Sequence, residues 1–416
     1  MSKLLLKNIK QLVQVRDENL QLVKGVDMKF LPVLENAWLA CDNGLIADYG
    51  SMDDFPGIAD WKDLEVIDCS GKIVMPAFAD SHTHIVFAGN REAEFVDRIN
   101  GLTYEEIAKR GGGILNSAAK LRETSEDDLY EQSLNRFHEI ISLGTGAVEI
   151  KSGYGLTLES ELKMLRVIKR LKERNEIPVK ATFLGAHAYP KEYLNDKPGY
   201  VKHVINEMLP AVGEEKLADY IDVFCENGYF SDVETKQILE AGAKYGLIPK
   251  LHAEQLSHSN GIVTGIACNA ISVDHLEYCN ESDIKALKNS NTMPVILPGA
   301  AYFLSLPNPP ARQMIDAGLP LAIASDYNPG SSPTGNMSFM MSIACIQYKM
   351  NPEEVINAST INGAYAMHVS EQVGSITPGK LANLFITKEI NSYSYIPYAF
   401  STPLIEKVII NGSVWN

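Results

Sequence analysis

Two histidines separated by one residue end an apolar stretch early in the chain. The segment 75–84 reads Met-Pro-Ala-Phe-Ala-Asp-Ser-His-Thr-His, so the pair is His82 and His84. Because successive side chains of an extended strand point to opposite faces, these two imidazoles point the same way. Neutral imidazole binds Zn or Fe, but two histidines make a weak site without further His, Asp or Glu ligands. The pair therefore predicts a metal site completed by distant residues, and the alternative is two histidines bonded to backbone or water.

The chain after this pair alternates short apolar runs with long amphipathic stretches. We expect eight strands, over residues 73–82, 146–151, 179–187, 220–225, 248–253, 270–275, 293–297 and 319–325. Ser125 and Ser231, each with an acidic residue three positions later, predict the first turns of two of the intervening helices. Short apolar strands that alternate with helices indicate a parallel sheet covered on both faces. The predicted fold class is α/β, a (β/α)8 TIM barrel.

Both ends of the chain look different from the middle. Residues 1–75 and the segment after Gly374 contain short extended runs separated by Asn-Gly, Gly and Pro signals, and they lack a helical period. We expect the N-terminal runs to form an antiparallel unit. The simplest arrangement is one composite β-sandwich domain, formed by residues 1–75 and 370–416, attached to a barrel of residues 76–369.

Composition excludes several kinds of partner. The formal net charge is −15 and the isoelectric point is near 5.1, so phosphate backbones and anionic lipid surfaces are not attracted. No apolar stretch approaches 18 residues, and the N-terminus shows no cleavage signal. The six cysteines are scattered without a C-x-x-C pair, which is typical of reduced thiols. We therefore expect a cytoplasmic protein that binds a small molecule and neither nucleic acid nor membrane.

The ends of the predicted strands carry side chains capable of chemistry. Barrel enzymes place catalytic groups at the C-terminal ends of their strands. Here those positions hold His82, His84, Lys151, His187, Glu226, His252, His275 and Asp326. Five of the nine histidines in the chain fall there, which favours a shared site over scattered core histidines. His82, His84, His252 and Asp326 are the side chains expected to converge on one divalent metal and leave positions open for water and substrate.

The same residues resemble a known family. The segment Pro76-x-Phe78-x-Asp80-x-His82-x-His84, the late His252 and His275, and the Ser325-Asp326 pair are similar to the amidohydrolase superfamily, whose members are metal-dependent hydrolases with a barrel and a composite β-sandwich. Longer motifs resemble the branch that hydrolyses 4-imidazolone-5-propanoate to N-formimidoyl-L-glutamate in histidine degradation. These motifs are Gly89-Asn90-Arg91-Glu92, residues 101–114 with their Gly111-Gly112-Gly113 run, 149–156 and 325–331. We read the glycine run as a flexible active-site loop.

The resemblance implies site residues one by one. It implies one Zn²⁺ or Fe²⁺/Fe³⁺ held by His82, His84, His252 and Asp326, and substrate contacts from Arg91, Tyr154, His187, Gln255, Asn328, Gly330 and Ser331. The chemistry of these residues agrees, because a guanidinium suits the propionate of the substrate and an aromatic ring can cover the imidazolone. Barrel enzymes of this type are often dimers, so a homodimer is expected, although the sequence shows no interface signature.

The hypothesis for catalysis is attack of a metal-activated water on the ring carbonyl carbon. Asp326 takes the proton and delivers it to the departing nitrogen, while His275 orients the water or stabilises the oxyanion. Gln255 stands where related deaminases carry a proton-shuttling Glu, so it should position substrate in the catalytic centre. Lys151 does not match the bridging lysine of two-metal members, which favours one metal. Alternatives are a hydrolase of another cyclic amide, a heterocycle deaminase, and a non-catalytic barrel protein.

Overall fold

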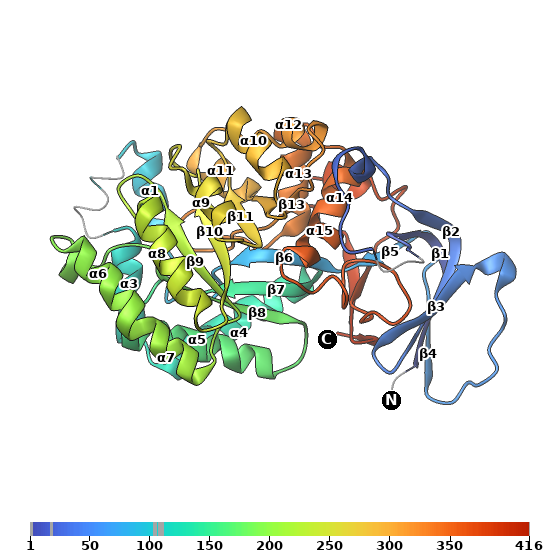
Figure 1. Cartoon of the computed structure of the whole chain (residues 1–416). Coiled ribbons are helices and arrows are strands. Elements are labelled where there is room, and N and C mark those ends of the chain that lie inside the picture. The colour runs from blue at the N-terminus through green and yellow to red at the C-terminus, as the bar shows by residue number, and fades with distance from the viewer. Residues whose placement is uncertain (1–2, 17–19, 103–105, 107–111, 416) are drawn as a thin grey trace.

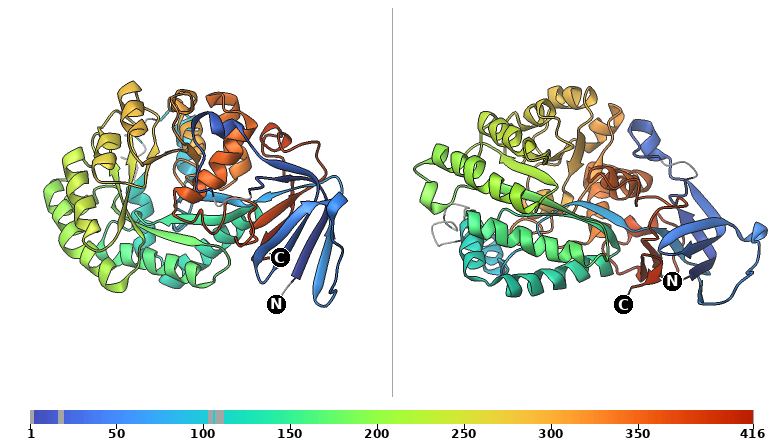
Figure 2. Two further views of the ribbon diagram at one scale, coloured as in Figure 1. Left: turned by 45° about the vertical axis from the view of Figure 1, so that its right-hand side comes forward. Right: turned by 60° about the horizontal axis from the view of Figure 1, so that its bottom comes forward.

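The computed structural model describes residues 3–16, 20–102, 106 and 112–415. Two separate sheets organise this part of the chain, and helices surround one of them to form a barrel (Figure 1). The barrel lies beside a mixed sheet that contains the first and the last strand of the chain (Figure 2). No helix among the described residues is long and apolar enough to cross a membrane.

Eight consecutive strands form the barrel sheet, and every hydrogen-bonded pair of neighbours is parallel. They are β6 (Phe78–Thr83), β7 (Thr145–Lys151), β8 (Val179–Ala186), β9 (Tyr220–Cys225), β10 (Ile248–Ala253), β11 (Ser272–His275), β12 (Met293–Ile296) and β13 (Ala322–Ile323). The predicted (β/α)8 barrel with a composite β domain is confirmed.

The barrel is closed just beyond its shortest strand. β13 spans only two residues, but the chain after it continues along β6. The amide of Asp326 donates to the carbonyl of His82 at 2.9 Å, and the amide of His84 donates to the carbonyl of Tyr327 at 2.9 Å. The carboxylate of Asp80 accepts from the Ser325 amide at 3.0 Å. Closure therefore places Asp326 directly beside His82 and His84.

The single strand predicted over residues 73–82 is wrong. The chain forms β5 (Ile73–Pro76), which joins the mixed sheet, and then β6, which joins the barrel. Between them the Ala77 amide donates to the carbonyl of Asn383 at 2.9 Å, outside the barrel. Both strands are buried and apolar at their junction, so periodicity gives no sign of the change of sheet.

The composite domain is one mixed sheet. Its strands are β1 (Lys3–Val13), β2 (Val33–Asp42), β3 (Leu45–Ser51), β4 (Leu64–Asp68), β5, β14 (Leu384–Thr387), β15 (Ile405–Ile410) and β16 (Ser413–Val414). One edge of β1 pairs with β4 and then with β5, both parallel, so the expected purely antiparallel N-terminal unit is wrong. The two predicted Asn-Gly turns are present, since Asn43 and Gly44, and Asn411 and Gly412, all adopt positive φ.

Two helices around the barrel begin where the sequence predicts, after Ser125 and after Ser231. The Ser125 hydroxyl accepts from the Asp128 amide at 3.1 Å, and Ser231 forms a reciprocal capping box with Glu234. The α-helices are α1 (Glu92–Ile99), α3 (Ile114–Glu123), α4 (Glu126–Ser142), α5 (Leu158–Glu173), α6 (Lys197–His203), α7 (Leu209–Glu215), α8 (Asp232–Ala243), α9 (Gly261–Ala267), α10 (Glu281–Lys288), α11 (Pro298–Leu304), α12 (Ala311–Asp316), α13 (Met337–Tyr348), α14 (Pro352–Ser359), α15 (Ile361–Tyr365) and α16 (Tyr395–Tyr398). The shorter turns are η1 (Gly25–Lys29), η2 (Met52–Asp54), η3 (Lys191–Tyr193) and η4 (Val204–Met208). All six cysteines are free thiols.

Asn383 joins the two sheets. Its amide nitrogen donates to the carbonyl of Gly146 in β7 at 2.9 Å, and its side-chain oxygen accepts from the Asn411 amide at 2.9 Å. The side chain is buried, so both bonds lie away from water. Asn is required because one donor and one acceptor are needed at the same place.

Replacing Asn383 by Asp tests this junction. The carboxylate retains the acceptor but puts an oxygen against the Gly146 carbonyl. We expect the free energy of unfolding to fall by about 1–3 kcal/mol in urea titrations. An unchanged urea midpoint would show that this hydrogen bond does not hold the sheets together.

Candidate active site

A cavity of about 810 Å³ opens at the C-terminal ends of the barrel strands. Its lining includes His84, Arg91, Arg98, Tyr154, His187, Phe224, His252, Gln255, His275, Asp326, Asn328, Gly330 and Ser331. Every expected substrate contact is in this set. His82 lies beneath His84, fully buried. The structure thus brings together residues that are up to 249 positions apart, as the barrel topology predicts.

Three of the four expected metal ligands lie close enough to share one ion, and the fourth, His252, lies near two of them. The Nε2 atoms of His82 and His84 are 3.3 Å apart, and Asp326 Oδ1 lies 3.4 Å from the first and 3.5 Å from the second. A ring nitrogen of His252 is within 4.8 Å of both. Ligands of a tetrahedral ion with bonds of about 2.1 Å are separated by roughly 3.4 Å. The spacing and the donor types therefore fit a single transition metal.

Two buried carboxylates fix the orientation of the histidines. His82 Nδ1 lies 2.6 Å from Asp274 Oδ2, and His252 Nδ1 lies 3.0 Å from Asp222 Oδ1. A carboxylate that accepts the Nδ1 proton leaves the Nε2 lone pair free for a metal. The sequence reasoning missed both acids. The available signal was an acidic residue inside the apolar strand β9 and another directly before His275 in β11.

Lys151 belongs to this charged layer and does not reach the cavity. Its ammonium donates to Glu149 at 2.6 Å and to Asp222 at 2.8 Å, and it lies 3.7 Å from Asp274. Lys250 bonds the other oxygen of Glu149. Burial alone lowers the pKa of Lys151, but the three carboxylates raise it above its usual value. The lysine is thus a buried cation that holds acids in place.

Burial keeps the rings of His82, His84 and His187 neutral. Burial, assisted by the nearby positive charge of Lys151, lowers the pKa of His82 and of His84 well below the usual value. Burial also lowers the pKa of His187 to about 3. Burial raises the pKa of Asp326, while the neighbouring His275 and His252 oppose that rise. Neutral imidazole is the form that binds a metal, so no proton has to leave these rings first.

The loop after Asp326 is an internally bonded turn. Asn328 Oδ1 accepts from the amides of Gly330 and Ser331, each at 2.8 Å. The Ser331 hydroxyl donates to Asp326 Oδ2 at 3.1 Å and accepts from Asn328 Nδ2 at 2.7 Å. Asp326 itself has φ +53°, a strained value for this residue type. Asn328 and Ser331 therefore hold Asp326 in place. Both residues also line the cavity, so the substrate contacts predicted for them stay a prediction.

Arg91 is held by Glu94. Its Nε and Nη2 atoms donate to Glu94 Oε2 at 2.9 and 2.6 Å, and the other Glu94 oxygen accepts from the Gly113 amide. Nη1 faces Gly330, where a Cβ would overlap it, so glycine is needed for the close approach. Arg98 donates to the Gly330 carbonyl at 3.0 Å. Two guanidinium groups thus meet at one wall of the cavity.

Tyr154 and His187 form an aromatic corner over the ligand cluster. The Tyr154 ring lies edge-on to His84 and to His187, with centroids 5.8 and 5.5 Å apart. His187 Nδ1 lies 3.0 Å from the Gly153 carbonyl, and Gly153 has φ +106°. This corner offers a flat surface for a planar ring.

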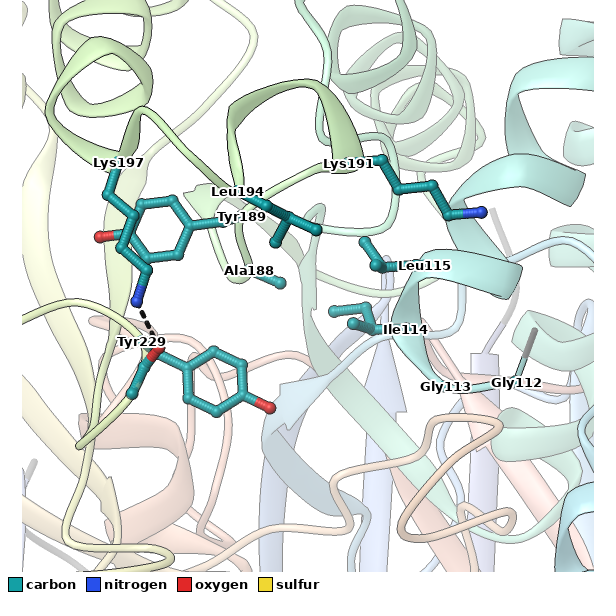
Figure 3. Close-up of a pocket in the computed structure, with 11 residues that line it drawn as sticks. Gly112, Gly113, Ile114, Leu115, Ala188, Tyr189, Lys191, Leu194, Lys197 and Tyr229 are labelled. Carbon is teal, nitrogen blue, oxygen red and sulfur yellow. Dashed lines mark hydrogen bonds between the residues drawn. The ribbon is translucent and has the colours of Figure 1, made fainter. Parts of the chain in front are cut away.

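Figure 3 shows a smaller hollow, of about 270 Å³. It adjoins the cavity, because Ile114, Gly228 and Tyr229 line both. Leu115, Ala188 and Leu194 make it mainly apolar. Gly112 and Gly113 lie at its edge, whereas Gly111 of the expected flexible loop lies outside the described residues.

Comparison with known proteins agrees with this fold. Residues 73–414 match the model of the amidohydrolase family. Two solved structures share the fold. An adenosine deaminase from Xanthomonas campestris with bound zinc superposes with a TM-score of 0.71 at 15% identity, covering 99% of this chain and 92% of that one. The Escherichia coli guanine deaminase gives a TM-score of 0.73 at 12% identity, covering 100% and 99%. At these identities the likeness concerns the fold alone.

Curated relatives are much more similar. Proteins named imidazolonepropionase from Flavobacterium johnsoniae and Christiangramia forsetii are 60% and 58% identical over 410 and 412 residues, with 99% of each chain covered. The one from Geobacillus kaustophilus is 41% identical over 416 residues, covering 100% of this chain and 98% of the relative. The chain therefore belongs to the amidohydrolase family and, within it, to the imidazolonepropionases.

The neutral state of His275 predicts a dependence of stability on pH. Burial lowers its pKa to about 4, against the opposing effect of Asp326. Between pH 6.5 and 4 the unfolded chain therefore gains a proton at this residue that the folded chain does not. This residue should reduce the free energy of unfolding by about 1.4 kcal/mol per pH unit as pH falls through that range.

A His275→Gln variant should lack this contribution. We expect its urea stability, measured without metal, to fall less steeply than that of the wild type from pH 6.5 to 4. Parallel curves would mean that His275 is protonated in the folded protein.

Proposed function

We propose that the protein hydrolyses the ring amide of 4-imidazolone-5-propanoate to N-formimidoyl-L-glutamate, the third step of histidine degradation. The observation that carries the proposal is the cavity itself, in which a cluster of three imidazoles and one carboxylate faces a wall with two guanidinium groups. Such a site can activate water at one end of a small molecule and hold a carboxylate at the other.

We propose that His82, His84, His252 and Asp326 hold one Zn²⁺ or Fe²⁺/Fe³⁺. The 3.3–3.5 Å separations among His82, His84 and Asp326 and the neutral rings of His82 and His84 support this assignment. His252 offers a ring nitrogen close to those of both histidines. A metal bound there supplies a Lewis acid and lowers the pKa of a coordinated water. Lys151 supports a single metal ion rather than two, because its ammonium is paired with buried carboxylates and does not serve as a bridging ligand.

Asp326 has the position and the chemistry of the proton carrier. Its carboxylate is buried, borders the cavity and has a raised pKa, so it can take up a proton and release it again. As water adds to the ring carbonyl carbon, Asp326 accepts the proton. It then gives the proton to the ring nitrogen when the carbon–nitrogen bond breaks. The Ser331 hydroxyl holds the carboxylate during this transfer.

The remaining residues bind and orient the substrate. Arg91, kept in place by Glu94, pairs with the propionate, while Tyr154 and His187 cover the imidazolone ring. His275 lies with a ring nitrogen within 4.8 Å of Asp326 and stabilises the oxyanion. Gln255 lines the cavity and positions the ring. Its amide cannot shuttle a proton, so the deaminase alternative has no support at this position.

We also propose a cytoplasmic homodimer. Aromatic side chains from α1, α11, α13 and the segment after α16 form two groups of ring contacts. Phe95 stacks on Phe303 with centroids 5.4 Å apart, and Tyr302 and Phe400 both contact Phe339. Phe95, Tyr302 and Phe400 are each at least 44% exposed. An exposed surface of this kind favours association between two copies. The free thiols are typical of a reducing compartment.

The proposal is tested by adding 4-imidazolone-5-propanoate, generated from urocanate by a hydratase, and following the loss of ring absorbance. We expect rapid loss that ends when a chelator removes the metal and returns on addition of Zn²⁺ or Fe²⁺. Loss that is no faster than without protein would exclude the proposed activity.

Replacing Asp326 by Ala should lower kcat by about 10²–10⁴-fold because proton transfer is lost. A Ser331→Ala variant keeps the carboxylate and removes two hydrogen bonds, one donated to Asp326 and one accepted from Asn328, so it should cost much less. Circular dichroism verifies that both variants fold. Near-normal turnover in the Asp326 variant would refute its role.

A further inference from the structure

Glu277 is a buried acid that forms no ion pair with a lysine or an arginine among the described residues. It follows β11 by two residues, and its side chain has no exposed surface. Neither of its carboxyl oxygens has a hydrogen-bond partner among the described residues. In that part of the chain, only His275 comes within ion-pair distance, with 3.6 Å between His275 Nδ1 and Glu277 Oε1. Unpaired buried acids are rare because they are costly, so this one needs an explanation.

The same contact leaves His275 Nδ1 without a partner. That nitrogen is buried and forms no hydrogen bond to any described residue. Two polar groups that lack all other partners thus face each other a few tenths of an ångström beyond hydrogen-bonding distance. Contacts in an active site are often long before substrate binds and shorten afterwards.

The backbone is bent to produce this arrangement. His275 has φ +89° and Leu276 has φ +72°, which are strained values for two consecutive residues that are not glycine. The Leu276 amide bonds the Ala253 carbonyl at 3.1 Å, and the Leu276 side chain is fully buried, so the bend is fixed. It returns the chain so that Glu277 lies against the His275 ring.

Glu277 is suited to be a neutral acid. Burial raises its pKa well above the usual value. Its own backbone amide and His252 oppose that rise, while the nearby Glu226 adds to it. A protonated carboxyl has one O–H donor, which the unprotonated Nδ1 of a neutral imidazole can accept. The neutral His275 then carries its own proton on Nε2.

We propose that Glu277 is a positioning residue that donates a hydrogen bond to His275 Nδ1 and thereby fixes the Nε2–H tautomer of that histidine. His275 then presents an N–H donor to the cavity in place of a lone pair. This inference rests on the proposed function, because the donor matters for a reaction in which negative charge develops on a carbonyl oxygen.

Glu254 provides a matched comparison. It lies two residues after His252, as Glu277 lies two residues after His275, and it is also buried. Its oxygens accept from the amides of Gly261 and Ile262 at 2.9 and 3.0 Å, at the start of α9. Its role is therefore the capping of a helix, and its loss should affect stability more than turnover.

The first experiment compares Glu277→Leu, Glu277→Gln and Glu254→Leu. Leu removes the donor from an unpaired site, so we expect kcat to fall at least tenfold with KM changed less than threefold and the melting temperature not lowered. Gln retains an N–H donor and should keep kcat within about threefold of the wild type. The Glu254 variant should show a lower melting temperature and near-normal kcat. Wild-type kcat in Glu277→Leu, or equal losses in the Leu and Gln variants, would overturn the proposal.

The second experiment determines the tautomer of His275 directly and does not depend on measuring turnover. In zinc-reconstituted protein labelled with ¹⁵N-histidine, the His275 resonances are identified by their loss in His275→Gln. We expect Nε2–H in the wild type and in Glu277→Gln, and a mixture of tautomers in Glu277→Leu. A resting wild type with Nδ1–H would overturn the proposal, even if the Leu variant does not fold. Inactivity of the wild type with Nε2–H in place would reject the proposed function alone.

Discussion

The pairing of opposite charges in the closed interior of the barrel is the constraint on which the structure depends. Ionised groups without partners are very costly away from water. Here the carboxyl groups of Glu149, Asp222 and Asp274 lie against the ammonium groups of Lys151 and Lys250, all with fully buried side chains. This layer lies directly under the histidines, and two of its acids accept their Nδ1 protons. The same contacts therefore pair the buried charges and orient the ligands.

Closure of the barrel is coupled to the same arrangement. β13 is short, so the sheet is completed by the segment that carries Asp326, whose amide bonds the backbone of His82. The strained φ values of Asp326 and His275 lie at strand ends, where the surrounding hydrogen bonds maintain them. These backbone conformations are costly in isolation, but they orient the side chains of Asp326 and His275. The hydrogen bonds of the rigid sheet offset that cost.

Much of this could be predicted from the sequence. Period-2 and helical patterns, Ser caps and Asn-Gly turns act over a few residues, so they identified the barrel strands, α4, α8 and two hairpins. The division of residues 73–82 between two sheets could not be predicted, because a buried strand has the same apolar pattern in either sheet. The roles of Asp222 and Asp274 could not be predicted either, since their partners are imidazoles on other strands.

The sequence by itself determined the types of ligand and their places at strand ends, because alternation along a strand and barrel topology are local and general rules. Only the tertiary structure decided which nitrogen of each imidazole faces the cavity. It also decided that Asn328 and Ser331 hold Asp326, and that Glu277 returns to His275. These facts depend on distances between groups that are neighbours solely in the folded chain, and on burial, which sets the charge of each group.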